Sequence, residues 1–96
     1  MPPMIVKLLT VELHIPGCSS LKEKRFALSS LKTRLRRRFN VAVAEVDHHA
    51  KWQRSSLAIV TVAVDRKMAD GSCDKALSFI ERDHRVEIME SSQEYC

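Results

Sequence analysis

Apolar and polar residues alternate along the chain between Met4 and Ile15, which is the pattern of a strand with one buried face. One side of this strand carries Ile5, Leu9, Val11, Leu13 and Ile15, and the other carries Val6, Leu8, Thr10, Glu12 and His14. The pair Pro16-Gly17 ends the strand, because proline has no N–H to donate to a sheet and glycine permits a turn.

After this turn the apolar residues recur with the period of a helix, which we expect from Leu21 to about Phe39. Ser20 is the expected N-cap, and Glu23 three residues later completes a capping box. The apolar stripe of the helix consists of Leu21, Leu28, Leu31, Leu35 and Phe39. Phe26 falls among the polar positions, as an exposed aromatic, a contact residue or simply a surface substitution.

The rest of the chain completes a recognisable order of elements. Strands are expected over 41–47, 56–64 and 85–89, with a helix from Asp65 to about Asp83. Right-handed crossovers in this βαββαβ order place both helices on one face of a four-stranded antiparallel sheet, with the first and third strands in the centre. We therefore predict an α+β, ferredoxin-like fold in a single domain over 4–90, followed by a flexible tail over 91–96.

The composition fits one small core and excludes several classes of protein. Apolar residues make up 45% of the 96 residues, and only two Gly and three Pro are present, which excludes a disordered or collagen-like chain. Cysteines at 18, 73 and 96 are too few for a secreted disulfide scaffold, so we expect a cytoplasmic location. The apolar stretches are strand-sized and the N-terminus lacks signal-peptide features, so no membrane partner is expected.

Positive charge is concentrated in the first helix. The formal net charge is +4, but the segment 21–40 carries +7 and the remaining residues carry −3. Such asymmetry is typical of a protein that binds a polyanion, most often a nucleic acid. The alternative is a solvated helix face that only keeps the protein soluble. The basic residues of the segment are Lys22, Lys24, Arg25, Lys32, Arg34, Arg36, Arg37 and Arg38.

The sheet face without helices is predicted to be a partner surface. By alternation we expect it to carry Leu8, Thr10, Glu12, His14, Val43, Glu45, Asp47, Leu57, Ile59 and Thr61. No aromatic ring lies on a central strand there, so reading of RNA bases by the sheet is disfavoured. Because monomers rarely expose large apolar patches, we expect a homodimer through this open face.

Candidate chemistry is sparse. Glu45 and the run Asp47-His48-His49 are the densest group of metal-ligating types, and a metal-dependent hydrolase there is a third alternative for the function. Adjacent strand residues point to opposite faces, so a strand end leading into a polar loop explains them better. We expect no catalytic residue, metal or cofactor. Trp52 could stack on a base, but a structural role is favoured.

Five stretches of the chain resemble the YlxP-like family of small uncharacterised bacterial proteins. The stretches are Leu9–Gly17, Ser20–Arg25, Arg38–Val41, Val43–His48 and Trp52–Arg54, within a match over about residues 4 to 90. The resemblance implies a ferredoxin-like fold and no established enzymatic activity. Genes of the family often lie near those for translation initiation and ribosome-binding factor A, which suggests a role at the ribosome. Phe26 departs from the pattern, since the family tends to be basic there.

The resemblance also marks family-motif residues beside the basic ones. They are Ser20, Glu23, Lys24, Asn40, Glu45, Asp47, His48, Trp52 and Gln53. Charge and resemblance together lead us to expect a non-enzymatic module that binds RNA or the ribosome and acts in translation or ribosome maturation. The alternative is a homodimeric protein-interaction module with no nucleic-acid role. The expected nucleic-acid-binding residues are Lys22, Arg25, Lys32, Arg36, Arg37, Arg38 and Arg54.

Overall fold

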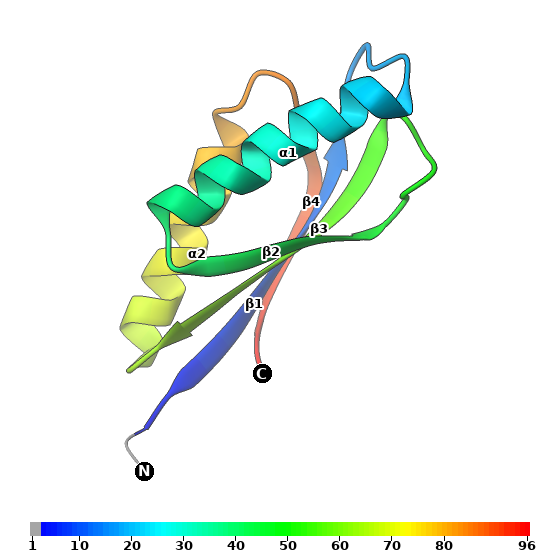
Figure 1. The fold of residues 1–96 in the computed structure, drawn as a ribbon. Coiled ribbons are helices and arrows are strands. Elements are labelled where there is room, and N and C mark those ends of the chain that lie inside the picture. Colours follow the sequence, from blue (N-terminus) through cyan, green and yellow to red (C-terminus); the bar gives the residue numbers. More distant parts are fainter. Residues whose placement is uncertain (1–2) are drawn as a thin grey trace.

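The computed structural model describes residues 3–96 and has the predicted element order. The elements are β1 (Ile5–His14), α1 (Leu21–Arg38), β2 (Val41–Asp47), β3 (Arg54–Ala63), α2 (Arg66–Glu81) and β4 (Glu87–Tyr95). The strands form one antiparallel sheet in the order β2-β3-β1-β4, and both helices pack on the same face (Figure 1). This confirms the ferredoxin-like α+β fold.

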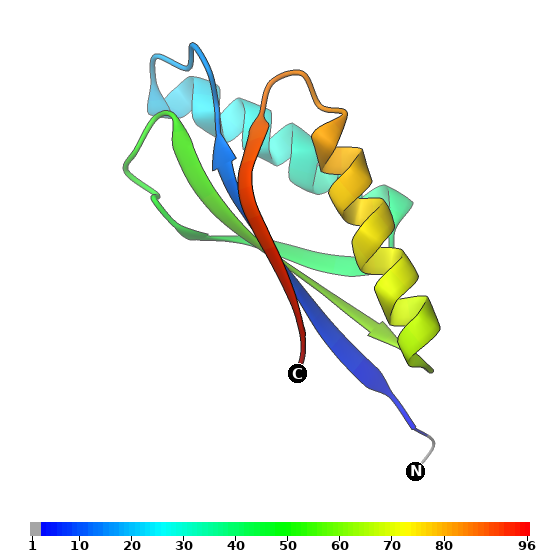
Figure 2. The same ribbon diagram turned by 180° about the vertical axis from the view of Figure 1, so that it is seen from behind.

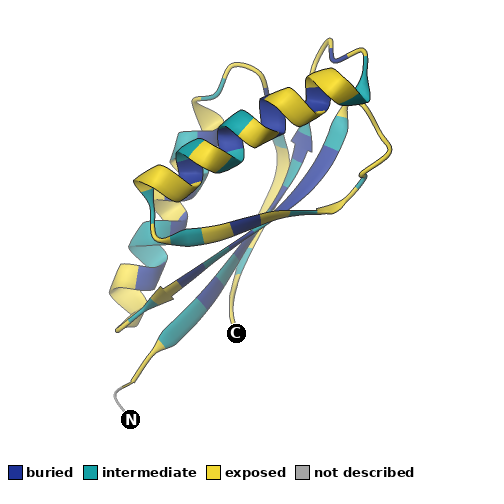
Figure 3. Ribbon diagram, in the orientation of Figure 1, coloured by how far each residue is buried: buried dark blue, intermediate teal, exposed yellow. Residues whose placement is uncertain are grey.

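The core lies between the sheet and the two helices. Its centre is formed by side chains with no solvent exposure, among them Leu9 and Leu13 of β1, Leu31 and Leu35 of α1, and Ile80 of α2. The stripe predicted for α1 is thus the face that packs on the sheet, and the exposed bands lie on its outer side (Figure 3). Burial of such side chains stabilises the fold by roughly 1.5–3 kcal/mol each.

The start of α1 is defined by its own sequence. The Ser20 hydroxyl accepts a hydrogen bond from the Glu23 N–H at 3.1 Å, as the capping box predicts. The Glu23 carboxylate reaches one residue further back than expected and accepts from the N–H of Ser19 at 2.8 Å and from its hydroxyl at 3.0 Å. These bonds lower the pKa of Glu23, the backbone N–H of Ser19 contributing most.

The predicted faces of β2 and β3 need correction. Leu57, Ile59 and Thr61, expected on the open face, are buried beneath the helices at 0–1% exposure, and Val43 is buried with them. Residues directly opposite in a sheet share a face, and Ile59 lies opposite Leu9, so the two sides of β3 are reversed relative to the prediction. The open face therefore carries the alternate apolar residues: Val6, Leu8, Ala42, Ala44, Ala58, Val60 and Val62.

The expected loose tail over 91–96 is wrong, because β4 continues to Tyr95. Its second half pairs with β1, with Tyr95 opposite Lys7 and Gln93 opposite Leu9 (Figure 2). The Tyr95 hydroxyl donates to Asp70 of α2, and Lys7 pairs with the same carboxylate at 2.6 Å. This half of the strand is mostly exposed and polar, so it lacks the apolar alternation by which a strand is recognised.

The long strands give the molecule an elongated shape, with principal extents of 48 × 21 × 19 Å. The first half of β1 and the end of β4 lie at the end of the sheet remote from the start of α1 (Figure 1). Neither helix within residues 3–96 is long and apolar enough to cross a membrane.

Candidate nucleic-acid interface

Six cations at the surface of α1 have no carboxylate partner within residues 3–96. They are Lys22, Arg25, Lys32, Arg36, Arg37 and Arg38, and all but the half-buried Lys32 are exposed. Arg25, Lys32 and Arg36 share one stripe by their spacing of seven and four residues. Six of the seven residues predicted to bind nucleic acid therefore lie on one helix, and no carboxylate of residues 3–96 neutralises their charge.

The two other cations of α1 are neutralised inside the protein. Arg34 pairs with Asp83, which follows α2, at 2.5 Å, and this bond ties the two helices together. Lys24 is 1% exposed and its Nζ lies 2.9 Å from Oε2 of Glu45 on β2. The charge available at the surface of α1 is therefore smaller than the sequence count.

Two of the surface arginines are oriented by neighbouring groups without losing their charge. Arg36 donates to the backbone carbonyl of Val43 at 2.7 Å, which links α1 to the adjacent edge strand β2. The guanidinium of Arg38 stacks over the ring of Phe79 on α2, 5.6 Å from its centre. Such contacts reduce the conformational entropy that these side chains would lose on binding a phosphate.

The second helix adds cations that sequence reasoning missed. Lys75 of α2 and Arg82, the C-cap of that helix, line a groove of about 500 Å³ with Arg38 and Phe79, and Asp74 is the carboxylate in its wall. Lys75 and Arg82 are seven residues apart and so share a helix face, which is a signal in the sequence. Only the packing of α1 against α2 places that face beside the end of α1.

The family-motif residues Lys24 and Glu45 form a buried cluster between α1 and β2. Glu45 accepts from the Ser55 hydroxyl at 2.6 Å, and Lys24 also donates to the backbone carbonyl of His48 at 2.6 Å. Burial pushes the pKa of Glu45 up, but the bonds from Ser55 and Lys24 and the charge of Lys24 outweigh it and lower the pKa. The cluster is therefore ionic, and it anchors the loop after β2.

The same loop is held by the other motif residues at its two ends. Asp47 accepts from the N–H of His48 at 2.7 Å, and His48 has a left-handed backbone with φ of 65°. Gln53 donates to the carbonyl of Cys18 at 3.1 Å, and its own carbonyl accepts from Ile15. Gln53 therefore supports the turn before α1, and the bond between Asp47 and His48 shapes the start of the loop.

Asn40 and Trp52 have different surroundings. The carbonyl of Asn40 accepts from Thr61 at 2.8 Å, which fixes the connection between α1 and β2. Trp52 is 52% exposed in the loop before β3, so it covers the core only in part.

Arg54 does not join the α1 surface. It lies on the open face of the sheet opposite His14, and its guanidinium is 4.0 Å from the carboxylate of Glu12. Its Nε atom is buried without a hydrogen-bond partner. The prediction that Arg54 adds to the basic helix therefore has no support in the geometry.

The residues named for a metal-dependent hydrolase do not face a common site. Glu45 faces Lys24 and the helices, whereas Asp47 lies opposite Ser56 on the open side of β3. His48 contacts Glu12 at 3.5 Å instead. Residues 3–96 contain no group of three His, Cys, Asp or Glu side chains arranged to hold a metal ion.

Comparison with known proteins shows related sequences. Residues 6–93 match the sequence model of the family described as "Protein of unknown function (DUF503)". The "Uncharacterized protein YlxP" of Bacillus subtilis (strain 168) is 34% identical over 76 residues, which cover 79% of this chain and 83% of that protein.

Solved structures are similar in fold alone. A C-terminal segment of the alpha subunit of aIF2 from Pyrococcus abyssi aligns over 97% of this chain with a TM-score of 0.52 and 17% identity. This chain spans about half of that segment, namely 49%. A protein named YJCS aligns over 93% of this chain and 96% of its own, with a TM-score of 0.50 and 9% identity.

Proposed function

The chain belongs to the DUF503 family of proteins of unknown function, and from its surface we propose that it is a non-enzymatic RNA-binding module. The basic surface of α1, defined as Lys22, Arg25, Lys32, Arg36, Arg37 and Arg38, contacts phosphates of the RNA. A cytoplasmic partner rich in accessible RNA is the ribosome or a ribosomal precursor, and a role in translation or ribosome maturation is part of the proposal.

The observation that carries the proposal is the absence of internal carboxylate partners for these cations within residues 3–96. A helix face whose charges are already paired would have little attraction for a polyanion. Here the pairing is confined to Lys24 and Arg34, which point inward or toward α2. The other charges stand at one surface of a body that is otherwise net negative, so a phosphate backbone is attracted to this surface in particular.

The groove beside the end of α1 also supports RNA binding by this surface. Lys75 and Arg82 extend the basic surface onto α2, where the aromatic ring of Phe79 already stacks under Arg38. Cations from two helices on either side of a groove can contact successive phosphates, whereas a helix that is only solvated needs no such arrangement.

The test is the salt dependence of RNA binding. In Lys32→Gln/Arg37→Gln, the affinity for a labelled ribosomal RNA fragment falls, and the slope of log K against log salt becomes shallower by about 1.4 to 1.8 for two lost phosphate contacts. Fluorescence anisotropy over a salt series measures both. Ribosome-profile fractionation of cells that express each form then shows whether the protein leaves the ribosomal fractions.

The matched control is Arg66→Gln/Lys67→Gln, which removes the same charge from the first turn of α2 at the far end of the molecule. It leaves the slope within about 0.3 of wild type, because no phosphate contact is lost there. Equal effects of the two double variants would contradict a defined interface on α1.

A second candidate is a homodimeric interaction module. The observation in its favour is the open sheet face, which carries Leu8, Val60 and the half-exposed Val62 without a covering helix. Apolar side chains gathered on one sheet face are typical of a surface that a partner covers. The two candidates use opposite faces of the sheet, so a dimer through the open face leaves α1 available to RNA.

A further inference from the structure

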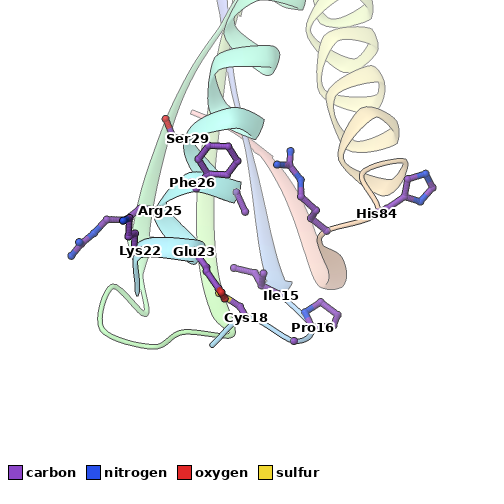
Figure 4. A pocket seen from close by; sticks show the side chains of 12 residues that line it. Ile15, Pro16, Cys18, Lys22, Glu23, Arg25, Phe26, Ser29 and His84 are labelled. Carbon is purple, nitrogen blue, oxygen red and sulfur yellow. The ribbon is translucent and has the colours of Figure 1, made fainter. Parts of the chain in front are cut away.

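A second groove lies at the opposite end of α1 from Lys75 and Arg82. It is bounded by the loop Ile15–Cys18, the first two turns of α1 and the loop that carries His84 and Arg85, and its volume is about 850 Å³ (Figure 4). This volume is within the range of sites that hold a small molecule or one part of a larger ligand. We call it the N-terminal groove.

The floor of the N-terminal groove is apolar, and an exposed aromatic ring stands at its edge. Ile15, Cys18 and Ala27 are buried and form part of its lining. Phe26 is 74% exposed, the most exposed of the large apolar side chains of residues 3–96. A single exposed apolar residue is ordinary at a surface, but here the ring borders a groove with an apolar floor.

The rim of the groove is cationic. Arg25 extends from α1 on one side of the Phe26 ring, and His84 stands across the groove (Figure 4). Lys22 and Arg25 have no carboxylate partner within residues 3–96, and the Arg85 guanidinium, 3.4 Å from Asp83, donates to the Ser30 hydroxyl at 3.1 Å.

Glu23 is the carboxylate in the wall, and its position is set by the helix cap. It accepts from the N–H and hydroxyl of Ser19, which turns its oxygens toward the loop before α1. Arg85 is balanced by Asp83, but the unpaired Lys22 and Arg25 outnumber Glu23, so the lining remains net positive. The ligand of this groove therefore combines a flat apolar part with negative charge.

We propose that the N-terminal groove holds an unpaired base of the RNA, stacked on Phe26, while Lys22 and Arg25 contact the flanking phosphates. This rests on the proposed function and adds the class of RNA that is recognised. Aromatic rings that accept bases by stacking need an open base face, and bases within a duplex are covered by their neighbours. The groove thus selects single strands, loops or bulges over continuous duplex.

The test uses a fluorescein-labelled oligouridylate of about ten nucleotides and a blunt RNA duplex of the same length. Phe26→Ala weakens binding of the single strand about tenfold, the effect of losing one stacked base, and changes duplex binding less than about twofold. Phe26→Trp restores single-strand binding. The slope of log K against log salt is unchanged in Phe26→Ala, because the phosphate contacts remain.

Met68→Ala is the matched control, since Met68 is 54% exposed on α2 and lies outside both grooves. It leaves both affinities unchanged. Thermal unfolding of each variant verifies the fold, which an exposed side chain such as Phe26 is not needed to maintain.

The results separate this proposal from the one it rests on. Single-strand binding by Phe26→Ala equal to wild type, with binding lost in Lys32→Gln/Arg37→Gln, overturns base stacking and leaves the RNA function standing. Equal weakening of single strand and duplex also overturns it. Absence of RNA binding by the wild type overturns both. A dimer that Phe26→Ala dissociates, with RNA binding intact, assigns the groove to a second copy of the chain instead.

Discussion

Lys24 and Lys22 are two residues apart on α1 and have opposite roles. Lys22 is exposed and unpaired, whereas Lys24 is 1% exposed and bonded to Glu45 and to the carbonyl of His48. A buried ammonium is tolerated only where its charge and its protons find partners, and these partners come from β2 and the loop after it. The difference between the two lysines is therefore one of surroundings rather than of residue type.

Removal of Lys24 is predicted to destabilise the protein strongly. Lys24→Met leaves the carboxylate of Glu45 without its cation and the carbonyl of His48 without its donor, and it lowers the free energy of unfolding by about 3 kcal/mol. Urea denaturation measures the change. The same substitution at the exposed Lys22 costs less than about 0.5 kcal/mol. Similar losses in the two variants would show that the Lys24 cluster contributes no specific stability.

The low pKa of Glu45 predicts loss of stability in acid. The folded state holds this pKa below its ordinary value of 4.5, so the unfolded chain binds a proton first as pH falls past that value. The stabilisation by ionised Glu45 is complete above pH 4.5 and is lost as pH falls through the lower folded value. Unfolding free energies measured across this range converge for wild type and Glu45→Gln, and a constant difference would contradict the assignment.

At the scale of elements, the second half of β4 is ordered by the elements that it contacts. Ser91 to Tyr95 offer little apolar surface of their own, but the edge of β1 that does not pair with β3 offers backbone groups that bond this half of β4. The end of the strand is then held by Tyr95. The centre of its ring lies 4.8 Å from the Lys7 ammonium and 4.9 Å from the Arg66 guanidinium, as cation–π contacts. Sheet pairing and these contacts together order a segment with weak strand signals.

Truncation after Ser91 is predicted to lower the free energy of unfolding by about 2 kcal/mol, through lost backbone bonds to β1 and lost contacts of Tyr95. Tyr95→Phe removes only the hydroxyl bond to Asp70 and costs about 1 kcal/mol or less. Chemical denaturation of both variants checks the order of the effects. An unchanged stability after truncation would mean that this segment is not part of the sheet in solution.

At the scale of the whole molecule, the sheet separates two surfaces of different character. The helical side carries the basic surface of α1 and both grooves, and the open side carries apolar residues in the middle with Glu12, His48 and Arg54 toward one end. Charge therefore favours a polyanion on the first side, and apolar contact favours a protein surface on the second.

A dimer through the open face predicts a specific response to substitution there. Val62→Lys places a charge on this face and shifts a dimer to monomer, whereas Met68→Lys on the exposed surface of α2 leaves the mass unchanged. Light scattering after size exclusion, over a range of protein concentrations, measures the mass. A wild-type chain that is monomeric at all concentrations would eliminate the dimer.

Much of the fold and one side of the candidate site follow from local patterns. Alternation identifies β1, the 3.6-residue period and the Ser20 cap identify α1, and the spacing of Arg25, Lys32 and Arg36 places these cations on one stripe. These signals are local because they depend on backbone geometry and on residues within a few positions of one another.

Tertiary structure alone decided the rest. The burial of Ile59 depends on which residue of β1 lies opposite it, and the alternation within β3 is compatible with either face. The pairing of Lys24 and Arg34, the addition of Lys75 and Arg82 to the basic surface, and the groove around Phe26 all require contacts between elements far apart in the chain. The sequence by itself determined how many charges the helix carries, and packing decided which of them remain free, because only neighbouring elements can neutralise a charge.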